Sequence, residues 1–167
     1  HLSGFGCRIL AYSYYEDEEV KKYAEYVSFE ELIQKSDIIT LHVPGNDENT
    51  HLIDETAFKK MKDGVLIVNT ARGLIIDTQA LIASLKNGKV GFAALDTFEG
   101  EVGLYYLNKE TQRLDNDNMA SLKSFPNVIL SPHMAFYTEQ AVSDMVENSI
   151  KGIIGFECGE DNRLAVK

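Results

Sequence analysis

The chain of 167 residues has only two cysteines, Cys7 and Cys158, and no Cys-x-x-Cys motif. Neither a disulfide framework nor a zinc site is therefore indicated, and we expect no bound metal. Long apolar runs are also lacking: none approaches the roughly 20 residues that span a bilayer, and the chain does not open on a basic-then-apolar signal peptide. We therefore expect a cytoplasmic protein that is not embedded in a membrane.

Basic residues are scarce as well. Lys and Arg number 16 against 26 Asp and Glu, which gives a formal net charge of -10 at pH 7. So acidic a chain disfavours broad, non-specific binding to nucleic acid or to anionic lipid. The hydrophobic content of 44% and charged content of 25% are those of a domain with a real core. They exclude disorder, collagen and coiled coil.

Five short apolar runs, rich in β-branched residues, punctuate the chain at 8–12, 37–43, 65–69, 91–95 and 127–130. They begin about 30 residues apart, the spacing of βα units with a parallel sheet and right-handed crossovers. Because the runs are apolar throughout, we expect strands covered on both faces. Between them, Ser28, Asp54, Asp77 and Thr138 stand where helix N-caps are expected. The pattern predicts one doubly wound, Rossmann-like α/β domain, with residues 100–117 as a loop over one rim.

The first six residues read as the last turn of a helix followed by a glycine stop, without the beginning of that helix. We therefore expect a fragment truncated at its N-terminus.

In an open parallel sheet, ligands bind beyond the carboxyl ends of the strands. The predicted strands bring to that edge Ser13, Val43, Pro44, Asn46, Asn49, Thr70, Ala71, Arg72, Gly73, Asp96, Glu101, Ser131, Pro132 and His133. Any one of these alone has an ordinary structural explanation. Together, however, an Arg can bind a carboxylate through two hydrogen bonds, and a His can exchange a proton with a carbonyl oxygen. A Glu beside that His would stabilise its protonated ring. The set favours reduction of a 2-oxo acid by hydride transfer.

Four ordered stretches resemble the NAD-binding domain of D-2-hydroxyacid dehydrogenases, and most of all their D-lactate dehydrogenase branch. They are Ser36-Asp37-Ile38-Ile39 with Leu41-His42-Val43-Pro44, Val68-Asn69-Thr70-Ala71-Arg72-Gly73, Ala94-Leu95-Asp96-Thr97-Phe98-Glu99, and Asn127-Val128-Ile129-Leu130-Ser131-Pro132-His133. The resemblance covers essentially the whole chain, 1–167. It implies that the first strand, the Gly-rich pyrophosphate loop and most of the substrate domain precede His1, and that residues from about 157 return toward that domain.

The resemblance also implies the roles of individual residues. Arg72 would bind the substrate carboxylate, and Glu101 would pair with His133, the acid/base. Residues implied to line the cofactor are Ser13, Val43, Pro44, Asn49, Thr70, Ala71, Arg72 and Asp96. Tyr137 would either border the substrate or pack under the last helix. We expect a structural role for His42 and a surface position for His51.

The resemblance further implies a homodimer that interconverts a small 2-oxo acid and its D-2-hydroxy acid, pyruvate and D-lactate first, with the 167-residue chain inactive by itself. Ser13 stands where the family has a ribose-binding Asp, which relaxes the preference for NAD over NADP. The acidic run 16–19 would repel a 2′-phosphate, so NAD is expected as the cofactor, with NADP use as a second possibility.

Three alternatives remain open on the sequence. A larger 2-oxo acid would change only the substrate. A binding module that senses NAD, as in corepressors of the same fold, would lack turnover. A flavodoxin-like or receiver domain would require a phosphate loop or an acidic pair after its first strand, and neither can be seen here.

Overall fold

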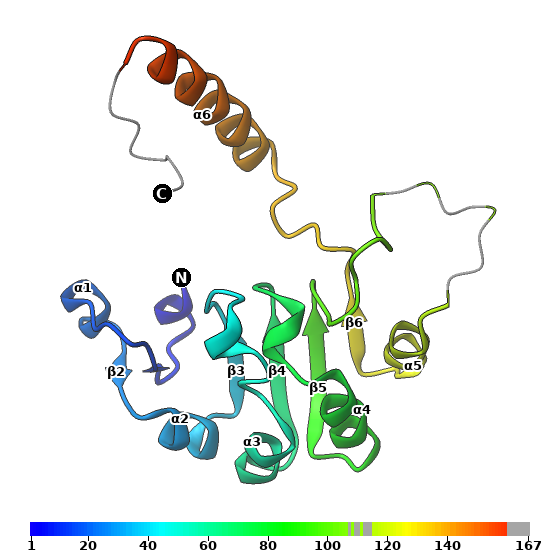
Figure 1. The fold of residues 1–167 in the computed structure, drawn as a ribbon. Helices are drawn as coiled ribbons and strands as arrows, with labels where there is room; N and C mark the ends of the chain where they lie inside the picture. Colours follow the sequence, from blue (N-terminus) through cyan, green and yellow to red (C-terminus); the bar gives the residue numbers. More distant parts are fainter. Residues whose placement is uncertain (107, 109–110, 112–114, 160–167) are drawn as a thin grey trace. The chain divides into compact units, whose positions relative to one another are not determined.

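The computed structural model describes residues 1–106, 108, 111 and 115–159 of the chain (Figure 1). It contains two compact units, His1–Pro132 and His133–Lys167, which are described separately.

The first unit contains all the strands, and every pairing is parallel. β1 (Leu10–Ala11) pairs with β2 (Glu25–Tyr26) in a sheet of two strands. The larger sheet contains β3 (Ile38–Leu41), β4 (Val65–Asn69), β5 (Val90–Leu95) and β6 (Val128–Leu130), paired in that order. Because all these pairings are parallel, the carboxyl ends of the four strands lie at the same edge of the sheet. This is the Rossmann-like α/β architecture that the sequence predicts.

Short helices connect the strands. They are α1 (Glu18–Lys21), α2 (Phe29–Lys35), α3 (Glu55–Lys60), α4 (Thr78–Lys86) and α5 (Asp117–Ser124), with 3₁₀ turns η1 (Leu2–Phe5), η2 (Asp47–Asn49) and η3 (Gly73–Ile75). Right-handed crossovers between neighbouring strands put α3, α4 and α5 on one face of the larger sheet. In agreement, α4 contacts α3, α5 and β5, and Figure 1 shows α3 and α4 side by side.

The predicted helix starts are confirmed by cap hydrogen bonds. The side chain of Ser28 accepts from the backbone N–H of Glu31, and that of Asp54 from Ala57. Asp77 accepts from two N–H groups at the start of α4. Each cap satisfies donors that the first helical turn leaves unpaired.

The core lies between the larger sheet and its helices. In β4, Val65, Ile67 and Asn69 are buried, whereas Leu66 and Val68 on the opposite face are only half-buried. Ile38 and Ile129 are more than half exposed. Within the first unit, the crossover helices α3, α4 and α5 cover one face of the larger sheet, and the cover of the other face stays a prediction.

Among the described elements, the strand β2, the helices α1 and α5, and the 3₁₀ turns η2 and η3 were not predicted. β2 has two residues and α1 has four, too few for a period of side chains to be visible. The predicted loop 100–117 contains residues outside the described ranges, and α5 begins at its last position, Asp117, behind the cap Asn116. Residues 1–6 do contain a helical turn, closed by Gly6 at a φ of 66°.

The second unit contains α6 (Glu139–Glu157), whose N-cap Thr138 accepts from the N–H of Ala141. The return predicted for residues from about 157 lies mostly outside the described residues. Within the described ranges, no helix combines the length and the apolar character needed to cross a membrane.

We predict that Leu122→Ala destabilises the full-length protein by roughly 3 kcal/mol, because it leaves a cavity under α5. Leu122 is 0% exposed. The matched control is Lys123→Ala on the exposed side of the same helix, which should change stability by less than about 0.5 kcal/mol. Urea unfolding of the two variants measures both, and equal losses would contradict the placement of α5 on the core.

Candidate functional site at the carboxyl edge of the sheet

The candidate site begins with the register of the larger sheet. Leu41 of β3 pairs with Asn69 of β4, and Asn69 pairs with Leu95 of β5. The three strands therefore reach the edge at the same level, and the segments that follow them start side by side. This brings together the predicted residues after β3, β4 and β5.

The loop that carries Arg72 is shaped by Asn69, which is 1% exposed. Its Nδ2 donates to the carbonyl of Arg72 at 2.9 Å, and its Oδ1 accepts from the N–H of Ala71 at 3.0 Å. The buried side-chain amide of Asn69 thus fixes the conformation of this turn. Arg72 itself is exposed, and its Nη1 donates to the carbonyl of Ala71. A planar, exposed guanidinium at this edge can bind a carboxylate with two parallel hydrogen bonds.

A second contact limits where Arg72 can lie. A Cβ added to Gly45 would come within 2.6 Å of Cγ of Arg72, so the Arg72 stem lies directly against the glycine. The loop after β3 thus borders the Arg72 side chain.

Asp96 follows β5 directly and is 5% exposed. The hydroxyl of Ser131 donates to its Oδ1 at 2.6 Å, and its backbone N–H donates to the carbonyl of Asn69 at 2.8 Å. A carboxylate held in this way has a defined position beside the loop of Arg72. The role of Ser131 in orienting Asp96 was not predicted.

Glu101 lies on the segment that continues from Asp96. Its Oε2 accepts from the N–H of Phe98 at 3.1 Å. Gly73, next to Arg72, packs against this segment: a Cβ on Gly73 would be 2.2 Å from the carbonyl carbon of Phe98. Only glycine fits there, so the segments bearing Arg72 and Glu101 are in direct backbone contact. Burial raises the pKa of nearby Tyr105, and Glu101 and Asp96 raise it further.

The predicted cofactor residues after β3 form a compact loop. Asn49 is 2% exposed, and its Nδ2 donates to the carbonyl of Pro44 at 3.0 Å. It therefore shapes the loop on which Val43 and Pro44 lie. Thr70, after β4, is exposed, and Ala71 is half-buried. Contacts of these residues with a cofactor remain predictions.

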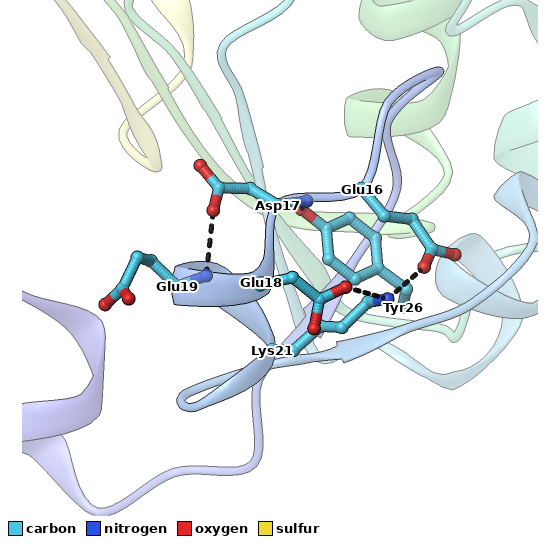
Figure 2. Close-up of polar contacts among 6 residues, drawn as sticks. All are labelled: Glu16, Asp17, Glu18, Glu19, Lys21 and Tyr26. Carbon is cyan, nitrogen blue, oxygen red and sulfur yellow. Dashed lines mark hydrogen bonds and ion pairs between the residues drawn. The ribbon is translucent and has the colours of Figure 1, made fainter.

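Ser13 is exposed just beyond β1, and its hydroxyl accepts from the N–H of Tyr15. The acidic run that follows is partly neutralised. Lys21 Nζ lies 2.8 Å from carboxylate oxygens of both Glu16 and Glu18, as Figure 2 shows, and these contacts raise the pKa of Lys21. Asp17 caps α1 through the N–H of Glu19. The run is thus less repulsive to a phosphate than its sequence suggests.

His133 and Tyr137 belong to the second unit. His133 has a left-handed backbone with φ of 51°, and Tyr137 is 69% exposed with its ring edge-on to Phe136. The packing of Tyr137 under α6 is therefore not observed within this unit. The pairing of Glu101 with His133 and the contact of Tyr137 with substrate stay predictions.

One polar contact at the edge was not foreseen. Nε2 of His51 lies 2.8 Å from Oε1 of Glu99, and both side chains are about two-fifths exposed. His51 is thus partly exposed, as expected for a surface residue, but it also makes a side-chain contact that was not expected. The two residues are 48 positions apart, and no local pattern in one sequence links them.

The chemistry of this edge fits the nucleoside ends of NAD. It offers exposed hydroxyls at Ser13 and Thr70 for ribose, apolar surface at Val43 and Pro44, and a fixed carboxylate at Asp96. A pyrophosphate-binding glycine loop is not among the described residues of this edge.

Comparisons with known proteins agree with this chemistry. Residues 1–135 match the family of D-isomer specific 2-hydroxyacid dehydrogenases, NAD binding domain. An aromatic 2-oxoacid reductase of Clostridium sporogenes is 48% identical over 157 residues, covering 93% of this chain and 47% of that protein.

Solved structures show the same relationship. A D-lactate dehydrogenase of Treponema pallidum has a TM-score of 0.94 at 38% identity, over 98% of this chain and 50% of that one. A D-lactate dehydrogenase of Aquifex aeolicus, complexed with NAD and lactic acid, has a TM-score of 0.87 at 37% identity, over 94% and 48%. The chain spans about half the length of these relatives. It belongs to the D-isomer specific 2-hydroxyacid dehydrogenases, and its residues 1–135 match their NAD-binding domain.

Proposed function

We propose that the full-length protein reduces a small 2-oxo acid, pyruvate first, to the D-2-hydroxy acid with NADH, and catalyses the reverse reaction. The observation that carries this is the exposed guanidinium of Arg72 on a loop held by buried Asn69, in direct backbone contact with the segment of Glu101. The guanidinium of Arg72 can bind the carboxylate of a 2-oxo acid, and the acidic residues nearby can assist proton transfer at the adjacent carbonyl.

Each residue has a distinct task in the proposed reaction. NADH, when bound, supplies the hydride to the carbonyl carbon. Arg72 grips the substrate carboxylate and orients the carbonyl, which lowers the entropic part of the barrier. His133 gives its proton to the carbonyl oxygen, and takes one from the hydroxyl in the reverse direction. Glu101 favours the protonated form of His133, and Asp96 faces the nicotinamide end.

The missing parts of the cofactor site and the substrate domain are proposed to come from the rest of the full-length protein. That part also sets which side chain the substrate carries. The relatives are named for both aromatic 2-oxo acids and D-lactate, so a larger 2-oxo acid is the second candidate. A homodimer in the cytoplasm is proposed as the working form.

Turnover of the full-length protein tests this function directly. We expect NADH oxidation with pyruvate and a D-configured product, measured by absorbance and chiral analysis. Phenylpyruvate in the same assay separates the aromatic alternative. NADH binding without turnover of any 2-oxo acid would favour a sensing module instead, and an L-product would contradict the proposal.

Arg72→Lys is expected to lower kcat/KM for the 2-oxo acid by at least about 100-fold, or roughly 2.7 kcal/mol. A lysine keeps the charge but cannot make the two-pronged contact with a carboxylate. Arg8→Lys is the matched control, since Arg8 is an exposed arginine paired with Glu25. Near-wild-type kinetics in Arg72→Lys would remove Arg72 from the site.

Ser13→Asp is expected to raise the preference for NADH over NADPH by about 10-fold, with little gain in NADH turnover. The new carboxylate accepts from ribose hydroxyls and repels a 2′-phosphate. Ser28→Asp adds the same charge at a helix N-cap, where Asp caps as well as Ser, and serves as the control. Unchanged use of NADPH in Ser13→Asp would show that Ser13 does not face the adenosine ribose.

A further inference from the structure

We propose that His51 and Glu99 form a positioning pair that ties together the segments after β3, β4 and β5 and thereby holds Glu101 in its working place relative to Arg72. The inference rests on the proposed function, because Glu101 and Arg72 take their roles from it. Neither His51 nor Glu99 is proposed to touch the substrate or the cofactor.

The backbone of His51 provides the first tie. Its N–H donates to the carbonyl of Leu74 at 2.8 Å, two residues beyond Arg72. A second backbone hydrogen bond joins the same two segments two residues further along, where the N–H of Ile53 donates to the carbonyl of Ile75. The segment after β3 is therefore joined to the segment after β4 at the position of His51.

The imidazole provides the second tie. His51 has a left-handed backbone with φ of 53°, an uncommon conformation for a residue with a side chain. From this backbone, Nε2 reaches Oε1 of Glu99 at 2.8 Å. Glu99 lies two residues before Glu101, in the segment that Gly73 touches. His51 thus connects the segments that follow β3, β4 and β5 at the carboxyl edge of the sheet.

Glu101 depends on this segment for its own position. Its carboxylate accepts from the N–H of Phe98, and its carbonyl accepts from the N–H of Leu104. The first bond closes a turn over residues 98–101, which contains Glu99, and the second closes the turn that follows it, over residues 101–104. If the turn lost its tie to His51, the Glu101 carboxylate would gain freedom, and displacements of about 1 Å can cost up to about 100-fold in rate.

The charges around His51 favour its protonated form. The hydrogen bond to Glu99 raises the pKa of His51; partial burial opposes this, and Asp77 and Asp54, the N-caps of α4 and α3, raise it further. Below this raised pKa, the contact is a charge-assisted hydrogen bond. As the pH rises through it, the charged contact is replaced by a weaker neutral one.

The experiment uses the full-length protein and the variants His51→Asn, Glu99→Ala and Glu99→Gln. Asparagine tolerates the left-handed backbone but is too short to reach Glu99, so it isolates the imidazole from the loop conformation. We expect kcat to fall between about 10-fold and 100-fold in His51→Asn and in Glu99→Ala. The Kd of NADH, measured by nicotinamide fluorescence, should change by less than about two-fold.

Three further readouts separate positioning from general stability. The double variant His51→Asn/Glu99→Ala should lose no more kcat than either single variant, because each single change already removes the same interaction. Glu99→Gln retains an acceptor for His51 and should recover most of the activity. The ratio of wild-type to His51→Asn kcat should be greatest at low pH and fall as the pH rises through the pKa of His51.

Lys62→Ala is the matched control. Lys62 and Asp37 form an exposed ion pair of the same 2.8 Å length at the amino end of β3. Its removal should leave kcat unchanged. Loss of activity that appears wholly as weaker NADH binding, or additive losses in the double variant, would overturn the proposal.

Hydrogen exchange tests the pair without reference to activity. We expect the amides of Phe98 and Leu104 to exchange faster than in the wild-type protein in His51→Asn and in Glu99→Ala. In Lys62→Ala we expect no change in their exchange rates. If the wild-type protein reduced no 2-oxo acid, the proposed function would fail, and the exchange result would still decide whether the tie exists. Should His51→Asn not fold, Glu99→Ala decides; unchanged exchange there contradicts the proposal.

Discussion

The parallel register between β4 and β5 determines where chemistry can occur in this chain. Asn69 is paired with Leu95, so Arg72 and Asp96 leave the sheet from adjacent strand ends. The contacts between the segments after β4 and β5 use that alignment: the carbonyl of Asn69 accepts from the N–H of Asp96, and Gly73 approaches Phe98. A slip of one residue would turn buried Asn69 to the opposite face and remove the support of the arginine loop.

Hydrogen bonds from polar side chains fix the conformation of the loops at the carboxyl edge of the sheet, and these loops carry the exposed site residues. Asn69 and Asn49 each use an amide to shape a loop, and Ser131 holds the carboxylate of Asp96. Such bonds are strong because water does not compete with them, and an unpaired partner would be costly. The loop that carries exposed Arg72 is already held in shape, so under the proposed function less ordering would be required when Arg72 binds the substrate.

The sequence predicts the strands and caps well because they depend on local information. β4 coincides with its apolar run, and Asp54 and Asp77 cap helices as expected. Contacts between loops could not be predicted, since the His51–Glu99 bond joins residues with no shared local pattern.

The order of the strands has a consequence for how the chain folds. Partners in the larger sheet, such as Ile38 with Leu66 and Ala93 with Val128, lie about 25 to 35 residues apart along the chain. Long loops must therefore close before any strand gains a hydrogen-bonded neighbour, and the local helices are too short to be stable alone. Folding is expected to be slow, and during its slowest phase the apolar strands β3 and β4 are open to pairing with other molecules.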